Sequence, residues 1–233
     1  MTANLLFPAE TAPVVPVVSE TRGYPVHRIF CVGRNYAAHA KEMGFEVDRE
    51  APWYFIKPSN AIVHSGATIA YPPETKNYHY EMELVVAIGA PAFRVPVADS
   101  LKAVYGYAAG LDMTRRDLQI GFREKSRPWD LGKAFEESAP IAAITKASQF
   151  QAIGPQRIWL KVGATIRQDA KLSDLVWSVP ELVSHLSRFY HLKPGDLIYT
   201  GTPAGVGPVV AGDTITGGID GLAPVTVKIG PAQ

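Results

Sequence analysis

The sequence contains a single cysteine, Cys31, in 233 residues. An internal disulfide is therefore excluded, and a composition this poor in cysteine is typical of proteins from a reducing cytoplasm. No run of about 18 apolar residues is present that could span a bilayer. The N-terminal segment lacks a basic region and is interrupted by Pro8, Pro13 and Pro16, which argues against a signal or transit peptide. We expect a cytoplasmic protein with Cys31 in its core.

An excess of charge of one sign is also missing. The chain has 23 basic and 22 acidic residues, and its net charge is +1. Without a block of lysine or arginine, sequence-independent binding of nucleic acid is not favoured. The composition of 47% hydrophobic and 19% charged residues is that of a globular protein, so we expect a small-molecule partner and no nucleic acid or membrane.

Nucleotide-binding glycine motifs are absent as well. The segment LIYTGTPAGVGPV predicts a strand followed by a glycine-rich loop, but neither G-x-G-x-x-G nor G-x-x-x-x-G-K-[ST] occurs in it. Pro203 and Pro208 also prevent the loop from opening directly into a helix that could hold a phosphate. Backbone N–H groups and the hydroxyls of Thr200 and Thr202 could still bind a carboxylate. A plain turn explains the same residues.

The distribution of proline, glycine and apolar residues indicates the organisation of the chain. Residues 1–25 are proline-rich and aperiodic, which predicts an N-terminal arm. Residues 26–233 alternate short apolar runs, such as WYFI, MELVVAI and IWLKV, with segments that hold many of the 19 prolines and 20 glycines. This alternation predicts one β-rich domain.

One helix is predicted in SVPELVSHLSRFYHL. Ser178 can cap its N-terminus, and Glu181 follows three residues later, which is the spacing of a capping box. We interpret this helix as scaffold because apolar residues recur at helical spacing. The predicted apolar stripe consists of Leu182, Val183, Leu186, Phe189 and Tyr190.

A shorter helix is predicted in YAAHAKEM, between Asn35 as N-cap and Gly44 as C-cap. A helix of about two turns is marginal in water, so it must dock on the body or act as a mobile cover. His39 and Glu42 are three residues apart and share one face of it. A histidine oriented by a carboxylate can activate water near neutral pH, although a surface pair of small energetic weight is the simpler interpretation.

The segment HYEMELVVAIG predicts one buried strand. Alternation places Glu81 and Glu83 on the same face as His79, with Met82 on the other. Two carboxylates aimed at one place suit a hard divalent cation, Mg²⁺ or Mn²⁺. Asp112, after the apolar run VYGYAAGL, is a candidate third ligand. A solvated sheet face for the glutamates and a turn cap at Asp112 explain these residues about equally well.

Basic residues follow Asp112 in DMTRRDLQ, and GKAF places Lys133 among small and apolar neighbours. Basic groups near three carboxylates would offset their charge or bind an anionic substrate. Surface positions are the simpler explanation for Arg115, Arg123 and Arg127. Lys133 fits that explanation less well because its context is apolar.

Seven segments occur in one order: GRNYAAHAKE, FIKPSNA, HYEMELVVAIG, GLDMTRRDLQ, GKAF, LIYTGTPAGVG and GLAPVTVKI. Together they resemble the fumarylacetoacetate hydrolase superfamily, most of all its short bacterial fumarylpyruvate hydrolases and acylpyruvases, over nearly everything after residue 25. The resemblance implies a β-rich α+β fold, a mixed β-sandwich or roll of the family's C-terminal-domain type with few short helices. It also implies a single catalytic domain, usually in a homodimer.

The resemblance implies roles for individual residues. His39 and Glu42 would form the water-activating pair on a lid helix, and Lys133 would assist the oxyanion or protonate the leaving carbon. The implied ligands of Mg²⁺ or Mn²⁺ are Glu81, Glu83 and Asp112. The implied substrate contacts are Arg34, Lys57, Arg116, Gln119 and Thr202.

The implied activity is hydrolysis of a carbon-carbon bond in an acylpyruvate, with 3-fumarylpyruvate favoured, in aromatic (gentisate) catabolism. One arginine among Arg34, Arg116, Arg123 and Arg127 would bind the distal carboxylate. Alternatives within the superfamily are an oxaloacetate decarboxylase and a hydroxymuconate-type isomerase. A non-catalytic dicarboxylate-binding protein is the alternative from another class.

Overall fold

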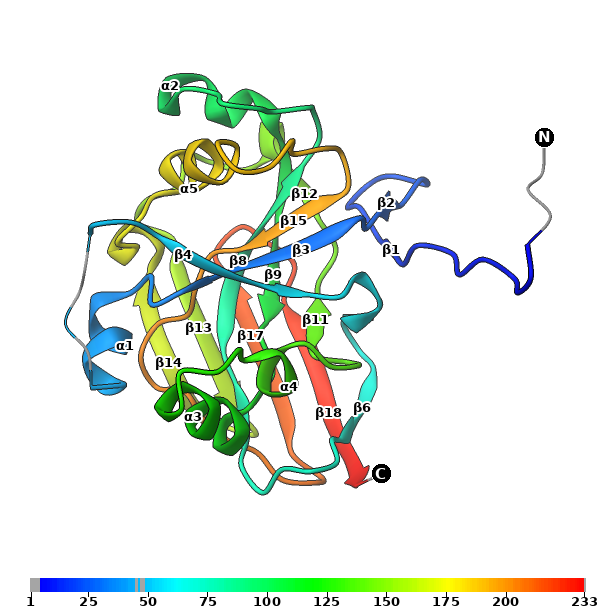
Figure 1. Ribbon diagram of the computed structural model, residues 1–233, viewed down its shortest axis with the longest axis vertical. Helices are drawn as coiled ribbons and strands as arrows, with labels where there is room; N and C mark the ends of the chain where they lie inside the picture. Colours follow the sequence, from blue (N-terminus) through cyan, green and yellow to red (C-terminus); the bar gives the residue numbers. More distant parts are fainter. Residues whose placement is uncertain (1–4, 45, 47–48, 233) are drawn as a thin grey trace.

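The computed structural model describes residues 5–44, 46 and 49–232. Within them, two large sheets pack against each other and short helices surround them (Figure 1). The larger sheet has eight strands in the order β4-β3-β15-β8-β9-β11-β5, with β12 paired to β9. Its strands are β3 (Arg28–Gly33), β4 (Trp53–Lys57), β5 (Ile62–His64), β8 (Met82–Ile88), β9 (Val104–Leu111), β11 (Ala139–Ile141), β12 (Thr145–Lys146) and β15 (Asp196–Tyr199).

The second large sheet has five strands in the order β14-β13-β17-β18-β6. Its strands are β6 (Thr68–Tyr71), β13 (Arg157–Val162), β14 (Thr165–Lys171), β17 (Thr214–Ile219) and β18 (Val225–Ala232). Two small sheets have the orders β10-β7-β16 and β1-β2. Their strands are β1 (Val14–Val15), β2 (Tyr24–Pro25), β7 (Tyr78–Tyr80), β10 (Thr114–Arg115) and β16 (Gly207–Pro208).

The helices are short. They are α1 (Ala37–Glu42), α2 (Val97–Ser100), α3 (Arg116–Glu124), α4 (Asp130–Lys133) and α5 (Val179–Leu186), with 3-10 turns η1 (Ser59–Ala61), η2 (Leu101–Ala103), η3 (Ala147–Gln149) and η4 (Leu172–Asp174). Helix α2 packs on α5, and α3 packs on α4 on the other side of β4 (Figure 1). In the described part of the chain, no helix has the length and hydropathy that a membrane crossing requires.

Strand β8 is buried on both faces, which explains its composition. Met82 and Leu84 belong to the core between the two large sheets, whereas Val85 belongs to a second core on the opposite face. The predicted buried strand is confirmed, but it is not continuous. The chain leaves the ladder at Glu81, and the residues before it form β7 in a small sheet. Glu81 and Glu83 therefore lie at the edge of the second core, where β8 begins.

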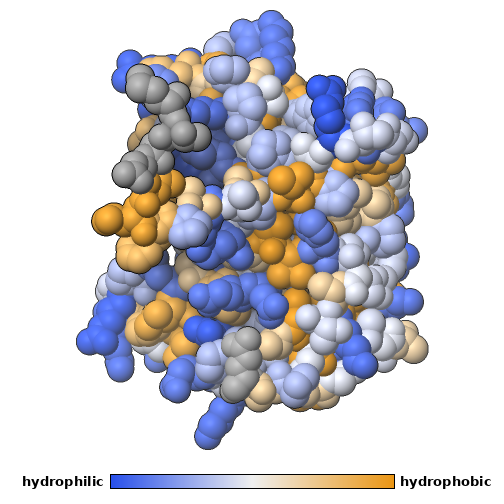
Figure 2. Space-filling model, turned by 90° about the vertical axis from the view of Figure 1, so that its right-hand side faces the viewer, coloured by the Kyte–Doolittle hydropathy of each residue, from blue (hydrophilic) through white to orange (hydrophobic). Residues whose placement is uncertain are grey.

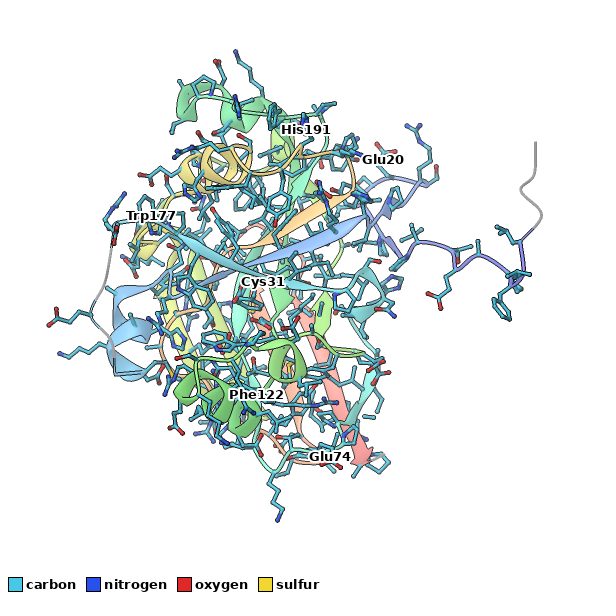
Figure 3. The ribbon with its side chains drawn as sticks, viewed as in Figure 1. Glu20, Cys31, Glu74, Phe122, Trp177 and His191 are labelled. Carbon is cyan, nitrogen blue, oxygen red and sulfur yellow. The ribbon has the colours of Figure 1, made fainter. Side chains whose placement is uncertain are left out.

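The single cysteine lies in this second core. Cys31 on β3 is fully buried and lies at the centre of the molecule (Figure 3). Burial raises the pKa of its thiol well above the usual range. The prediction of a core cysteine is confirmed, and a buried, protonated thiol is chemically inert.

The scaffold helix α5 forms as its capping box predicts. The backbone N–H and the hydroxyl of Ser178 donate to Glu181 Oε2 at 2.8 Å and 2.7 Å. The apolar stripe is shorter than predicted, because the helix ends before Phe189 and Tyr190, which are exposed. The buried members of the stripe are Leu182, Val183 and Leu186.

The predicted caps of α1 are each displaced by one residue. The N-cap is Tyr36 and the C-cap is Met43, while Gly44 follows with φ +82°. The side-chain amide of Asn35 donates instead to Trp177 O at 3.0 Å and to Thr200 O at 2.8 Å. The side chain of Asn35, predicted as the N-cap, therefore makes tertiary hydrogen bonds instead of capping α1.

The proline-rich arm is partly built into the body. Val15 and Tyr24 in β1 and β2 are buried, and Tyr24 Oη donates to Ile88 O at 2.7 Å. Residues 5–9 project from the body (Figure 1), and residues 1–4 of the predicted arm lie outside the described residues. Figure 2 shows the face that carries this segment, with apolar side chains gathered near its middle.

Candidate active site

Three carboxylates meet where β8 and β9 run side by side. Glu83 lies opposite Gly110 in the antiparallel ladder, and the N–H of Asp112 donates to Glu81 O at 2.9 Å. Ligand oxygens of Glu81, Glu83 and Asp112 lie within 4.8 Å of one another, and all three side chains are buried. The structure therefore brings together the three residues predicted as metal ligands, which we call the acid cluster.

Two buried cations, Lys133 and Arg116, contact Glu81 of this cluster. Lys133 Nζ donates to Glu81 Oε2 at 2.9 Å, to Asp112 Oδ2 at 2.6 Å and to Thr114 Oγ1 at 2.7 Å. Arg116 pairs with Oε1 of Glu81. Burial raises the pKa of Glu81, but the charges of Lys133 and Arg116 outweigh burial and hold that pKa well below its usual range. Glu81 is therefore ionised.

Glu83 is the least compensated of the three carboxylates, because it has no ion pair with Lys133, Arg116 or Lys57. Burial raises the pKa of Glu83 well above its usual range, and the charges of Asp112 and Glu81 add to this, against one N–H bond from Gly201 at 2.8 Å. Asp112 Oδ1 is buried and accepts no hydrogen bond from the described residues, although Lys57 Nζ lies 2.9 Å away. Carboxylate oxygens are ligands that Mg²⁺ and Mn²⁺ prefer, so this donor set fits a divalent cation.

Lys57 lies behind the acid cluster. Its side chain is fully buried and is not part of the cavity wall described below. Besides Asp112, its ammonium contacts Met113 O at 3.1 Å and Lys133 O. In the structure it is a counter-ion of Asp112, so we no longer assign it the substrate contact expected from the sequence.

Helix α1 brings the predicted pair to the same place. The buried ring of His39 lines the cavity with the acid cluster, and its Nδ1 lies 3.0 Å from Glu42 Oε2. The other oxygen of Glu42 accepts the N–H of Gly205 at 3.0 Å. Glu42 thus ties α1 to the glycine-rich loop, residues 200–208, and leaves Nε2 of His39 for the cavity.

Gln168 on β14 holds this loop, and sequence reasoning missed it. Its Nε2 donates to Thr202 Oγ1 at 2.8 Å and to Pro203 O at 2.7 Å, while its Oε1 accepts the N–H of Met82 at 2.9 Å. Because Thr202 Oγ1 accepts from Gln168, its own hydrogen remains for the cavity, which Thr202 lines. No local pattern marks Gln168, since its partners lie far away in the sequence.

Glycine is required at position 201. Gly201 has φ +97°, and a Cβ there would lie 2.7 Å from the Cβ of Asn35. Only glycine lets the backbone turn here and aim its N–H at Glu83. The loop therefore orients one member of the acid cluster directly.

Helix α3 was not predicted, yet one face of it lines the cavity. Arg116, Gln119 and Arg123 are three and four residues apart, so they share that face. Arg116 Nη1 donates to Gln119 Oε1 at 3.0 Å. The helix packs closely on α4, where a Cβ on Gly132 would lie 2.9 Å from Gln119 Cβ. The spacing of the three polar residues is the signal that could have revealed the helix.

His79 supports the site from outside the acid cluster. Its Nε2 lies 2.8 Å from Asn77 Oδ1, and Arg116 Nε donates to its Nδ1 at 3.4 Å. Burial, followed by the charge of Arg116, lowers the pKa of His79 to about 4. A neutral ring at this place orients Arg116 rather than holding a metal.

The cavity above the acid cluster has a volume of about 40 Å³. Besides the residues above, its wall includes three aromatic side chains, Trp53, Phe55 and Trp129. Of the arginines considered for the distal carboxylate, Arg34, Arg116 and Arg123 line it. Arg127 is exposed and lies on a neighbouring groove instead.

A family model described as the C-terminal domain of fumarylacetoacetate (FAA) hydrolase matches residues 28–230. The chain belongs to this family. It is 51% identical over 193 residues to a fumarylpyruvate hydrolase of Ralstonia sp., which covers 82% of this chain and 100% of the relative. It is 42% identical over 201 residues to the human mitochondrial oxaloacetate tautomerase FAHD1, covering 86% of this chain and 90% of the relative.

The family member from Pseudomonas aeruginosa described as fumarylpyruvate hydrolase has a crystal structure in complex with Mn²⁺ and pyruvate. It superposes with a TM-score of 0.95 at 48% identity, covering 98% of this chain and 100% of that chain. The family resemblance and the β-rich sandwich with few short helices, both expected from the sequence, are therefore confirmed.

Proposed function

We propose that the protein is a metal-dependent hydrolase that cleaves a carbon-carbon bond in an acylpyruvate, with 3-fumarylpyruvate as its substrate. The observation that carries this proposal is that the acid cluster and His39, which is paired with Glu42, line one cavity. The 51% identity to a fumarylpyruvate hydrolase supports the choice of substrate. Fumarate and pyruvate are the products.

Glu81, Glu83 and Asp112 would hold Mg²⁺ or Mn²⁺. Such an ion acts as a Lewis acid and stabilises the negative charge that develops at the 2-oxo acid end. The Mn²⁺ and pyruvate in the Pseudomonas aeruginosa structure support a divalent cation and a 2-oxo acid as the groups bound here.

His39 is the base of the proposed reaction. Its Nε2 takes a proton from a water molecule whose oxygen attacks the ketone next to the fumaryl chain. Glu42 accepts the Nδ1–H bond and stabilises the imidazolium, and the N–H of Gly205 keeps Glu42 in place. The carbon-carbon bond then breaks, its electron pair remains with the pyruvyl fragment, and the proton held by His39 completes pyruvate.

Lys133 contributes charge to the site. Its three N–H groups are directed at Glu81, Asp112 and Thr114, so the ammonium orients the cluster and adds a positive charge beside the developing oxyanion. Thr202 and the amide of Gln119 have hydrogens left for the substrate, because their oxygens accept bonds from Gln168 and Arg116. We assign them to the carboxylate of the 2-oxo acid end.

Tautomerisation of oxaloacetate is the second candidate, since the tautomerase relatives are 42% identical. It requires proton transfer but no attacking water. The experiment is to incubate the purified protein with Mn²⁺ and either fumarylpyruvate or oxaloacetate and to identify products by NMR. We expect fumarate and pyruvate from the first. Turnover of oxaloacetate without cleavage of fumarylpyruvate would favour the tautomerase.

We also propose that the protein acts in the cytoplasm as a homodimer, in the gentisate branch of aromatic catabolism. A single buried thiol is consistent with a reducing compartment. The exposed apolar side chains of Leu5, Leu6 and Phe7 supply surface that a second copy could cover. Light scattering at several protein concentrations tests for the dimer. A monomeric mass at every concentration would contradict the proposed homodimer.

A further inference from the structure

The cations around the cavity fall into two groups. Arg116 and Lys133 contact Glu81 and compensate the acid cluster. Arg34 and Arg123 line the same cavity away from those ion pairs. Burial and then the charge of Arg123 lower the pKa of Arg34, so the two guanidinium groups are close enough to repel each other. Two guanidinium groups on one cavity offer forked donors to a carboxylate.

Helix α3 fixes the separation between Arg116, at the acid cluster, and Arg123, farther along the cavity wall. Arg123 follows Arg116 by seven residues, so it shares the same helix face. At 1.5 Å per residue it lies roughly 10 Å farther along the axis. Arg116 contacts the acid cluster, where the 2-oxo acid end is proposed to bind. The separation is comparable with the length of an extended acylpyruvate that ends in a second carboxylate.

Arg34 is held by its backbone and by an aromatic ring. It follows β3 with φ +56°, a left-handed conformation that is uncommon for a residue with a side chain and often marks functional sites. Its Cζ lies 5.7 Å from the centroid of the Trp53 ring. A Cβ on Gly33 would lie 2.0 Å from Cζ2 of the same ring, so the indole rests directly on the backbone before Arg34.

The aromatic side chains of the cavity form one wall. Trp53 meets Trp129 edge to face with centroids 4.7 Å apart, and it lies 6.0 Å from Phe55. Rings fixed against each other in this way offer flat, rigid surface. A planar, conjugated acyl chain would lie against such a wall with little loss of conformational freedom.

We propose that Arg34 and Arg123 together bind the distal carboxylate of the substrate, and that Trp53, Phe55 and Trp129 accept a flat, unsaturated chain between that carboxylate and the reacting ketone. The inference rests on the proposed function and adds that the substrate must carry a second carboxylate at its distal end. It assigns the distal anchor to two arginines acting on the two oxygens of one carboxylate.

The first test changes the substrate and leaves the protein intact. We compare fumarylpyruvate, its ester at the distal carboxylate, and acetylpyruvate with the wild-type protein and Mn²⁺. Loss of hydrogen bonds to a charged group should lower kcat/KM for the ester and for acetylpyruvate by roughly 10- to 100-fold, mainly through KM. Equal kcat/KM for all three would overturn the proposal.

The second test changes the arginines. Arg123→Gln and Arg34→Gln should each lower kcat/KM for fumarylpyruvate by roughly 10- to 100-fold and leave acetylpyruvate within about twofold. Arg34→Lys should recover part of the lost kcat/KM, because lysine keeps the positive charge but cannot donate two parallel hydrogen bonds to the carboxylate. Arg127→Gln is the matched control, since this exposed arginine lies outside the cavity, and both substrates should be unaffected.

The outcomes separate this inference from the proposed function. Hydrolysis of acetylpyruvate with equal losses on both substrates in the Arg123 and Arg34 variants would overturn the arginine anchor and leave the hydrolase standing. Failure of the wild-type protein to hydrolyse any of the three compounds would overturn the proposed function, and this inference with it.

Discussion

Helices α1 and α5 are both short, yet they are stabilised in different ways. Helix α5 carries its capping box in its own sequence and buries an apolar stripe. Helix α1 has no side-chain cap, and its buried residues are His39 and Ala40. It is held instead by the contact of Glu42 with the glycine-rich loop. A scaffold helix can be recognised locally, whereas the helix that brings chemistry to the site depends on residues far away in the sequence.

The two helices also use the same spacing for different purposes. In α5 the pair Ser178 and Glu181 satisfies the helix N-terminus. In α1 the pair His39 and Glu42, also three residues apart, leaves one histidine nitrogen facing the cavity. If this contrast is correct, changes in α1 should remove activity with little effect on stability, and changes in α5 should do the reverse.

The largest expected effect is that of His39→Ala. Removal of the general base should lower kcat for fumarylpyruvate by about 10³-fold, while Mn²⁺ binding and the melting temperature stay close to wild type. His185→Ala is the matched change in the last turn of α5. Its ring stacks on Tyr54 with centroids 5.7 Å apart, so we expect lower stability with kcat within about twofold. Unchanged turnover in His39→Ala would remove the role given to that residue.

Glu42→Gln should have the next largest effect. The amide oxygen can still accept the N–H of Gly205, but it carries no charge to stabilise an imidazolium. We expect kcat to fall by roughly 10- to 100-fold, measured at saturating substrate. A large drop in melting temperature together with the loss of kcat would show that Glu42 acts on the fold and not on the reaction.

Glu181→Ala should cost about 1 kcal/mol of unfolding free energy, because the N–H and the hydroxyl of Ser178 at the start of α5 lose their acceptor. Denaturant unfolding followed by circular dichroism measures this change. Activity should stay within about twofold of wild type. A large loss of kcat would show that α5 is coupled to the site and would break the contrast with α1.

The smallest expected effect is the pH dependence of the unfolding free energy that Glu181→Ala removes. Burial raises the pKa of Glu181, but the hydrogen bonds of Ser178 and the charge of Arg49 outweigh it and lower the pKa below 4.5. The ionised carboxylate therefore stabilises the fold above about pH 4.5, and this contribution is lost as pH falls through the folded-state pKa. The stability gap between wild type and Glu181→Ala should shrink in acid, and a gap that widens there would contradict this account.

Local chemistry explains which parts of the site could be predicted. The E-x-E strand, the strand end at Asp112 and the i, i+3 pair of α1 each depend on one segment. Helix α3 was missed because Leu118, Ile120 and Phe122 alternate with other residues, which is the period of a strand. Gln168 was missed because its partners on β8 and the glycine-rich loop are distant in sequence.

Lys57 shows the limit of prediction by motif. It occurs in a segment that resembles the family, but the sequence alone does not distinguish a residue in the cavity wall from one behind it. In the structure its ammonium pairs with Asp112 from the buried side. Only the tertiary packing that brings the end of β4 to Asp112 settles which of these positions it takes.

The three buried carboxylates of the acid cluster are crowded together because they hold a divalent cation. The most direct test is Glu83→Gln, with Mn²⁺ binding measured by calorimetry and apo-protein stability by denaturant unfolding. We expect Mn²⁺ affinity to fall by roughly 100-fold or more, and apo-protein stability to stay the same or rise, because Glu83 is crowded by Asp112 and Glu81. Unchanged Mn²⁺ affinity with a loss of stability would show that the pair serves the fold and not a metal.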